Sequence, residues 1–417
     1  MKIIKQYTLL VLHWLSFVGL LFLGIKIALY FKPEPTMDSR YYWALATDLS
    51  IYHKGGLIGI WLLPLKWLSL KPYEAALVMN GVLLFFTYCA TMIFPKISNW
   101  KQALVQLAAT LGSAMFAFWF SGYLGIINAD FTNVALIIIS LRLFYGYLQN
   151  GKKVTFALGL FTMFFAISFR VKTGLALGGI LVFLVLFGFK HLMTAQREKV
   201  LVIALAILLI GAAGIEVGLR VQSEAKVDVA RQGRLQLYTG LLDTSVGPMC
   251  GRWTREAYEK TLEDLDLSIF QVFEKHLGVK SKRYIVDIVL CKLKAIVGYT
   301  DFSYNEIIPV GVQYRPVTTG DYDIIRKYEP LEDQLVSIFK WMVYGMMLVT
   351  FVIGSKYRML GRTLPIFVYF TFLALHAVFE IQARYMVEPL MWTYFSGVLV
   401  FAYEVWLKSD SIKQTRI

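Results

Sequence analysis

The sequence predicts an all-α polytopic membrane protein with about ten transmembrane helices, interfacial helices on the outer face and a mostly helical outer domain. Of its 417 residues, 57% are hydrophobic and 17% are charged, whereas soluble domains are about 45–50% apolar and about 25% charged. The apolar residues form many runs of about 17–23, each long enough to cross about 30 Å of hydrocarbon as a helix. These values exclude a disordered chain, a soluble globular enzyme and a nucleic-acid-binding module.

The apolar runs predict ten spans in two membrane regions. The spans are 9–31, 74–94, 103–120, 126–148, 154–169, 173–190, 200–217, 336–354, 364–380 and 386–407. Residues 1–217 form a region of seven spans that includes the first outer loop, 32–73. Residues 336–417 form a region of three spans, and residues 218–335 between them form an extracytoplasmic domain.

A shorter apolar run, 57–70, decides the orientation. Pro64 and Lys66 interrupt it, and a segment of this length is more often interfacial than spanning. If it does not cross and the N-terminus is cytoplasmic, every short cytoplasmic loop is basic, as the positive-inside bias requires. The basic residues on that side are Lys2, Lys5, Lys96, Lys101, Lys152, Lys153, Lys190, Arg197, Lys199, Lys356, Arg358, Arg362, Lys408, Lys413 and Arg416. We therefore expect a multi-pass protein of the cell membrane with both termini cytoplasmic. Its net charge of +14 then reflects this bias, and no nucleic acid is expected as a partner.

The first outer loop carries a carboxylate, Asp38, just before an aromatic stretch suited to the membrane interface. Pro33 and Pro35 end the preceding helix. Asp38 is interpreted either as a helix N-cap or as a base or metal ligand at the membrane surface, and the two roles are compatible. Asp48 is expected to be a solvated residue of the same helix.

A second carboxylate, Asp130, lies near the outer end of the fourth span. A carboxylate there is costly unless it is paired, hydrated or metal-bound. Asn128 and Asn133 could share a polar site with it. The alternative is a residue at a helix start, which the helix dipole favours.

Two cations, Arg170 and Lys172, lie between two short spans on the outer face, against the positive-inside bias. They could snorkel to the interface or bind a lipid phosphate, for which such side chains are the usual partners. The violation of the charge rule favours phosphate binding.

A polar patch ends the ninth span, where Glu380, Gln382, Arg384 and Tyr385 are followed by Glu388. Glu380 and Arg384 are four residues apart, so a helix could pair them. Several polar groups gathered at a membrane face are expensive, which favours a functional site.

The large outer segment contains two predicted helical stretches, about 254–277 and about 281–297, where apolar residues recur at helical spacing. Cys250 and Cys291 both lie in this segment and could form a disulfide, which the sequence alone leaves open. Cys89 is expected to be a buried thiol within the membrane.

Three segments stand at informative places along this topology. The first outer loop contains 37–42 (MDSRYY), an acidic residue ahead of an interfacial helix. The segment 237–242 (LYTGLL) follows the seventh span, and 380–385 (EIQARY) precedes the last one. Together with the topology, these segments resemble the GT-C superfamily of membrane glycosyltransferases. This superfamily includes the protein O-mannosyltransferases and the lipid A aminoarabinose transferase.

The resemblance implies an enzyme that transfers a sugar at the outer face of the membrane. The implied donor is a polyprenyl-phosphate sugar, and the acceptor is a cell-envelope glycolipid, polysaccharide or protein, with membrane lipid around the site. The implied roles are catalytic for Asp38 and Asp130, donor-phosphate binding for Arg170, Lys172 and Arg384, and site-ordering for Glu380, Gln382 and Tyr385. Protein mannosyltransferases commonly have two adjacent acidic residues in the first loop, whereas Ser39 follows Asp38 here. Dependence on a divalent cation and the type of acceptor therefore stay open.

Two rival functions are weighed against this one. A polysaccharide polymerase or ligase also uses lipid-linked sugars, but it would carry two Arg-rich outer loops, and 218–335 has no such symmetry. A transporter of lipid-linked sugars would place charges near the bilayer midplane and show two-fold pseudo-symmetry. The carboxylates here gather at one face instead, so transport ranks third.

Overall fold

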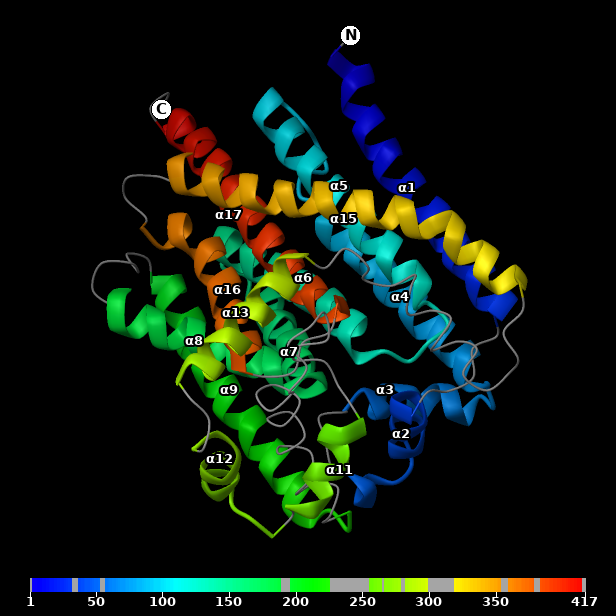
Figure 1. Ribbon diagram of the computed structural model, residues 1–417. Helices are drawn as coiled ribbons and strands as arrows, with labels where there is room; N and C mark the ends of the chain where they lie inside the picture. The colour runs from blue at the N-terminus through cyan, green and yellow to red at the C-terminus, as the bar shows by residue number, and fades with distance from the viewer. Residues whose placement is uncertain are drawn as a thin grey trace.

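The computed structural model describes most of the chain, and the described residues contain helices and turns but no strand (Figure 1). The described residues are 2–31, 37–52, 57–188, 196–225, 255–264, 266–278, 282–298, 319–353, 359–378 and 383–414. The predicted all-α class is therefore confirmed over these ranges.

The helices follow the predicted apolar runs closely. The N-terminal ones are α1 (Lys2–Phe31), α2 (Met37–Leu45), η1 (Leu49–Ile51), α3 (Ile58–Trp67), α4 (Pro72–Thr91), α5 (Trp100–Gly122), α6 (Ala129–Asn150), α7 (Lys153–Phe169), α8 (Val171–Gly188) and α9 (Gln196–Gln222). The later ones are α11 (Arg255–Glu263), α12 (Ile269–Leu277), α13 (Lys282–Gly298), α15 (Thr319–Ile353), α16 (Met359–Val378), η2 (Ala383–Met386) and α17 (Val387–Gln414).

Six helices of the described chain are long and apolar enough to cross a membrane. They contain the segments Tyr7–Phe31, Pro72–Thr91, Trp100–Gly122, Ala129–Asn150, Gln196–Gln222 and Pro330–Val352. The other predicted spans lie in α7, α8, α16 and α17. Helix α3 has 10 residues, and a helix of that length reaches only about 15 Å, so it cannot cross alone. The helices thus support a multi-pass membrane protein.

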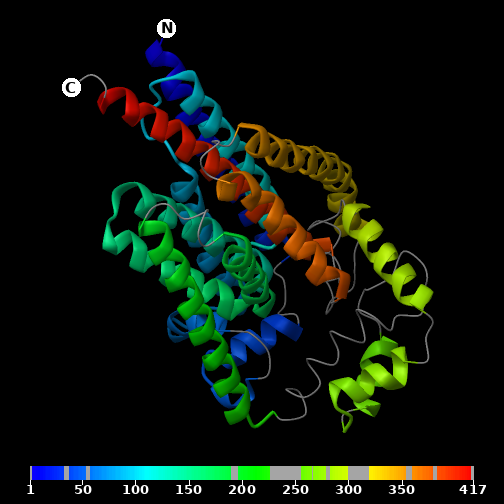
Figure 2. The same ribbon diagram turned by 90° about the vertical axis from the view of Figure 1, so that its left-hand side faces the viewer.

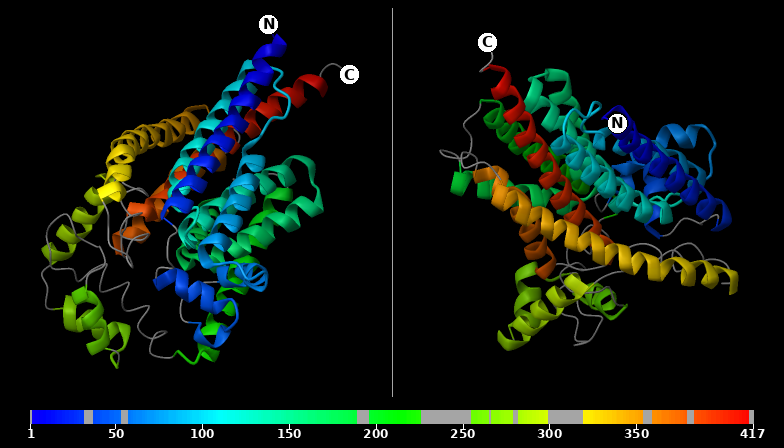
Figure 3. Two further views of the ribbon diagram at one scale, coloured as in Figure 1. Left: turned by 90° about the vertical axis from the view of Figure 1, so that its right-hand side faces the viewer. Right: turned by 90° about the horizontal axis from the view of Figure 1, so that it is seen from above.

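The two ends of the bundle differ in what they carry. Both chain termini lie at one end, the top of Figure 1, whereas α2, α3, α11 and α12 lie at the opposite end (Figures 1 and 2). Helix α1 packs along α5, and α6 packs along α7 and α17 (Figure 3). The segment between α1 and α4 therefore lies at the end remote from both termini.

Close helix packing depends on glycines at two contacts. A Cβ at Gly112 of α5 would come 2.5 Å from the ring of Tyr394 in α17. A Cβ at Gly159 of α7 would come 2.7 Å from the ring of Phe144 in α6. Helices in lipid approach closely where their residues are small, so these two glycines let aromatic rings pack directly on backbone.

One buried amide fixes the turn that leads into α6. Asn80 of α4 donates from Nδ2 to the carbonyls of Tyr123, Leu124 and Ile126, at 3.3, 3.1 and 3.1 Å. Its Oδ1 lies 3.4 Å from the Thr132 hydroxyl. The Tyr123 carbonyl also accepts from the Ile126 amide at 2.9 Å, so Asn80 adds a second hydrogen bond there and supplies a donor to the carbonyls of Leu124 and Ile126 in the same buried turn.

Asn80→Leu is expected to lower the free energy of unfolding by about 1–3 kcal/mol, because it removes the side-chain donor of the Leu124 and Ile126 carbonyls in this buried turn. Thermal unfolding of the purified protein in detergent would measure the loss. The matched control is Thr87→Ala on the same helix, since the Thr87 hydroxyl bonds only to the carbonyl of Leu83 within α4. An Asn80→Leu protein as stable as the control would contradict this role.

The structure corrects two expectations about the outer segments. The predicted helix 254–277 is two helices, because Asp264 ends the first and binds the second. Its carboxylate is 3% exposed and lies 2.6 Å from both Lys275 Nζ and His276 Nε2 in α12. Asp48 is exposed as expected, but it lies beyond α2 and caps η1 by accepting from the Ser50 amide at 3.0 Å.

The cysteines differ from the prediction in one respect. Cys89 is a free thiol, but it is exposed on α4 rather than buried. It shares an exposed stripe with Val78, Val82 and Phe85, and in a membrane such a stripe faces lipid. The hydropathy of the sequence does not distinguish a residue that faces lipid from one in the protein core, because both positions are apolar. Cys291 is disulfide-bonded, and Cys250 lies outside the described residues.

The predicted start of the second membrane region, residue 336, lies inside a continuous helix. Helix α15 has 35 residues and contains Pro330. Its apolar part, Pro330–Val352, begins before the predicted span.

Candidate functional site

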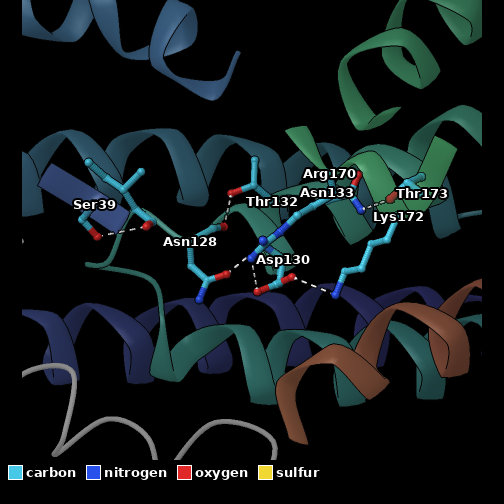
Figure 4. A network of polar contacts seen from close by, with 9 residues as sticks. Ser39, Asn128, Asp130, Thr132, Asn133, Arg170, Lys172 and Thr173 are labelled. Carbon is cyan, nitrogen blue, oxygen red and sulfur yellow. Dashed lines mark hydrogen bonds and ion pairs between the residues drawn. The ribbon is translucent and has the colours of Figure 1, made fainter. Parts of the chain in front are cut away.

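The N-terminus of α6 holds the central carboxylate, Asp130, which is 3% exposed. Asn128 caps the helix by accepting from the Asp130 amide at 2.8 Å, and Thr132 Oγ1 donates to the Asn128 carbonyl at 2.9 Å (Figure 4). Asp130 is the second residue of α6, where the helix dipole favours a negative charge. The helix-start interpretation is therefore correct, and it does not exclude a site.

Two cations converge on this carboxylate, Arg170 from the end of α7 and Lys172 from the first turn of α8. Arg170 Nη2 lies 2.5 Å from Asp130 Oδ2, and Lys172 Nζ lies 3.4 Å from Asp130 Oδ1 (Figure 4). The two basic side chains are 22% and 21% exposed. They therefore pair with a buried acid instead of only snorkelling to the interface. Among these three side chains, two positive charges face one negative charge.

The electrostatics of this group extend to the first outer loop. Burial lowers the pKa of Arg170, but Asp130, with smaller contributions from Tyr42, Tyr385 and Asp38, more than offsets burial, so the pKa of Arg170 lies above its ordinary value. Burial also raises the pKa of Tyr42; Arg170 opposes this effect, and Asp38 and Asp130 add to it. Arg170 therefore stays charged and Tyr42 stays neutral near neutral pH, and Asp38 belongs to the same electrostatic environment.

Helix α2 contains Asp38, which acts electrostatically on Arg170 and Tyr42. Asp38 is half-buried and lies in the first turn of α2, which begins at Met37. Its neighbour Ser39 donates from Oγ to the Ile127 carbonyl at 3.0 Å, which ties α2 to the turn before α6 (Figure 4). The residue is thus within the helix rather than ahead of it.

The short helix η2 adds an aromatic face. Lys172 Nζ lies 3.4 Å from the centroid of the Tyr385 ring, and Arg170 Cζ lies 5.8 Å from it. Tyr385 also stacks on His376 of α16, with centroids 6.2 Å apart. Of the other residues predicted here, Glu380 and Gln382 lie outside the described residues, and of Arg384 only the backbone, in η2, is described. Tyr385 therefore joins the predicted site, and these three stay predictions.

Tyr385→Leu is expected to lower the free energy of unfolding by about 0.5–2 kcal/mol, because it removes the aromatic face that Lys172 contacts at 3.4 Å. Tyr385→Phe keeps the ring and is expected to stay within about 0.5 kcal/mol of wild type. Thermal unfolding of the purified protein in detergent would measure both variants. A Phe variant as unstable as the Leu variant would mean that the hydroxyl, and not the ring, matters.

Three further side chains complete the cluster. Thr173 Oγ1 donates to Glu388 Oε1 at 2.5 Å and accepts from Asn133 Nδ2 at 2.7 Å. The sequence suggests that Asn133 could share a polar site with Asp130, and it places Glu388 in the polar patch after the ninth span. Thr173 was missed, since a threonine in an apolar helix costs little and gives no signal.

An apolar cavity of about 240 Å³ begins one helical turn from this cluster. Its lining includes Leu177 of α8 and Trp392 of α17, four residues after Thr173 and Glu388 respectively. Residues four apart share a helix face, so the cavity lies on the same faces as the polar cluster. The arrangement suits an amphiphile with an anionic head and an apolar chain.

The described residues offer no ready-made metal site. Within the described ranges no group of three or more His, Cys, Asp or Glu side chains gathers closely enough to hold an ion.

The sequence matches no protein-family model and no curated protein. The fold defines the class of protein as a multi-pass helical membrane protein. The function must be argued from the site, because function depends on specific residues and not on the fold.

Proposed function

We propose that the protein is a membrane glycosyltransferase, which moves a sugar from a polyprenyl-phosphate donor to a cell-envelope acceptor at the outer face. The observation that carries this proposal is the convergence of Asp130, Arg170, Lys172 and Tyr385 from three separate segments. The resemblance to the GT-C superfamily supports it as well. The adjacent cations Arg170 and Lys172 suit a phosphate, and the cavity beside the cluster suits a lipid chain.

The reaction follows from these groups. The acceptor oxygen bonds to the anomeric carbon while the bond from that carbon to the phosphate oxygen breaks, and its electron pair leaves with the polyprenyl phosphate. Arg170 and Lys172 stabilise the anion that develops. Asp38 takes the acceptor proton, because a carboxylate within reach is needed and this one is half-buried and near Arg170. Asp130 has both oxygens facing cations, so it positions them and is not the base.

The proposed topology has ten spans, both termini in the cytoplasm and 218–335 outside. Two observations support it. The termini share one end of the bundle, and α2 and α3 lie at the other (Figure 1). Cys291 is disulfide-bonded, and disulfides persist in oxidising compartments outside the cytoplasm.

Labelling of single introduced cysteines is expected to report this topology. In a Cys89→Ser background, Thr47→Cys should react with an impermeant maleimide in intact cells, whereas Ser98→Cys should react only after lysis. Both positions are exposed, so access to the reagent depends on the side of the membrane. The opposite labelling pattern would show that the protein has the inverted orientation and would contradict a site at the outer face.

The rivals fit less of the geometry. A transporter would place its charged residues near the midplane, whereas Asp130 and Arg170 lie where α6 begins and α7 ends. A polymerase or ligase shares the donor chemistry and would differ only in its acceptor. It therefore stays an alternative within the same donor class.

The deciding experiment is sugar transfer by purified protein reconstituted in lipid. A panel of polyprenyl-phosphate sugars would be supplied with glycolipid, polysaccharide and protein acceptors. Transfer from at least one donor is expected. Absence of transfer together with movement of the donor across the vesicle membrane would favour the transporter, and growth of a polymer would favour the polymerase.

A further inference from the structure

Beside Arg170 and Lys172, which are cationic donors, lies a buried group of polar side chains that offers hydrogen-bond acceptors. Glu388 is 2% exposed, and Asn133 and Thr173 are fully buried. They form one hydrogen-bonded row across α6, α8 and α17, with Thr173 in the middle. Thr173 directly follows Lys172 in the chain, so this row adjoins the cationic group.

Two acceptor atoms of this row are unused. Glu388 Oε2 and Asn133 Oδ1 are buried and have no hydrogen-bond partner among the described residues. The Thr173 hydroxyl gives its proton to Glu388, so it can only accept from Asn133. This directs the amide nitrogen of Asn133 to Thr173 and leaves Oδ1 as the second acceptor. Buried acceptors without donors are rare in native structures and call for an explanation.

The two unused acceptors, Glu388 Oε2 and Asn133 Oδ1, favour a ligand that donates hydrogen bonds. A phosphate would be repelled by a carboxylate and an amide oxygen, whereas a hydroxyl can donate to either. The cations behave in the opposite way, and Arg170 Nε is itself buried without a partner in the described chain. The cluster thus has an anion-binding part and a part that binds hydrogen-bond donors, with Lys172 acting electrostatically on Glu388.

We propose that Glu388 and Asn133 form a subsite that binds hydroxyl groups of the transferred sugar, held in place by Thr173. This inference rests on the proposed glycosyltransferase function. In a sugar phosphate the anionic oxygens and the nearest hydroxyl are only a few bonds apart. The two parts of the cluster are adjacent in the same way, because Lys172 and Thr173 are consecutive residues of α8.

The test compares four lipids that differ only in the sugar. Binding of undecaprenyl phosphate, either bare or carrying glucose, galactose or mannose, would be measured on the full-length protein in nanodiscs. Wild type is expected to bind at least one sugar-bearing lipid about tenfold or more tightly than the bare phosphate. Glu388→Gln is expected to remove most of that preference and to leave binding of the bare phosphate within about threefold.

Two further variants separate recognition from folding. Thr173→Val keeps the Glu388 carboxylate but removes the hydroxyl that holds it in place, so it is expected to lose part of the preference for sugar-bearing lipid. This variant also tests the subsite if Glu388→Gln is not recovered folded. Glu332→Gln changes a buried carboxyl of α15 and is expected to keep the wild-type preference. Thermal unfolding would accompany each variant.

The outcomes are distinct for the two proposals. Equal loss of both lipids in Glu388→Gln, or no loss, overturns the sugar subsite, as does a wild type that binds the bare phosphate as tightly as every sugar-bearing lipid. The phosphate site and the proposed function survive those results. A wild type that binds none of these lipids overturns the proposed function and the subsite together.

Discussion

Arg170→Ala is expected to lower the rate of the proposed sugar transfer by about 10²–10³ and to destabilise the protein, and adding Asp130→Ala is expected to restore only the stability. Of the two cations that face Asp130 in the described chain, the single change leaves Lys172, at 3.4 Å. Removing one partner of a buried pair costs about 3–5 kcal/mol, and the remaining lysine should keep the loss near the lower value. The double variant buries no unpaired carboxylate, and replacing a whole buried pair is often neutral.

The rate of sugar transfer should respond differently from the stability. In the proposed reaction it falls because the leaving phosphate is no longer stabilised by Arg170. Losing one preorganised donor to a developing anion costs about 10²–10³ in rate. This loss should persist in the double variant, since the guanidinium is still absent. Thermal unfolding in detergent and transfer in reconstituted vesicles would measure the two effects. A double variant with wild-type transfer would show that Arg170 only neutralises Asp130.

Arg220→Ala is the matched control for this cycle. Arg220 is comparably exposed, and its Nη2 lies 2.6 Å from Glu216 Oε1 one turn earlier in α9. It contacts none of the groups around Asp130 that the structure describes. Its loss is expected to leave transfer unchanged.

The helices could be predicted from the sequence because lipid leaves the backbone no other choice. Every peptide group in hydrocarbon must be satisfied internally, so an apolar run of sufficient length becomes a helix. Each of the ten predicted runs overlaps one helix. The pattern could not show which helices pack together, since lipid-facing and core positions are equally apolar, as the exposed Cys89 illustrates.

The charged residues of the site could also be predicted, because a charge at a membrane boundary is costly and therefore conspicuous. Asp130 and Arg170 were both expected at the outer face, but their pairing across 40 positions has no local signature. Neutral polar residues are harder to identify. Thr173 in an apolar helix can always satisfy its hydroxyl on its own backbone, so its role became visible only when Glu388 was brought to it.

Asp38→Asn is expected to lower the rate of transfer by about 10²–10⁴, the usual contribution of a general base. Stability should change by less than about 1 kcal/mol, because the side chain is half-buried in the first turn of α2 and a carboxylate there gains only about 0.3–1 kcal/mol from the helix dipole. Asp48→Asn is the control from the same outer segment, since Asp48 is exposed and caps η1. Transfer rates of the three proteins, with unfolding temperatures beside them, would decide the matter.

The Asp38 variant also separates a base from a metal ligand. A base removes a proton, so added divalent cation should not recover the asparagine variant, and Asp38→Glu should retain part of the rate. A weakened metal ligand would instead be rescued as the cation concentration rises, because occupancy follows mass action. Unchanged transfer in Asp38→Asn would reduce the residue to a helix-dipole role. Arg170 and Lys172 would then remain the proposed phosphate-binding pair, and the proposed reaction would need a different base at this end of the bundle.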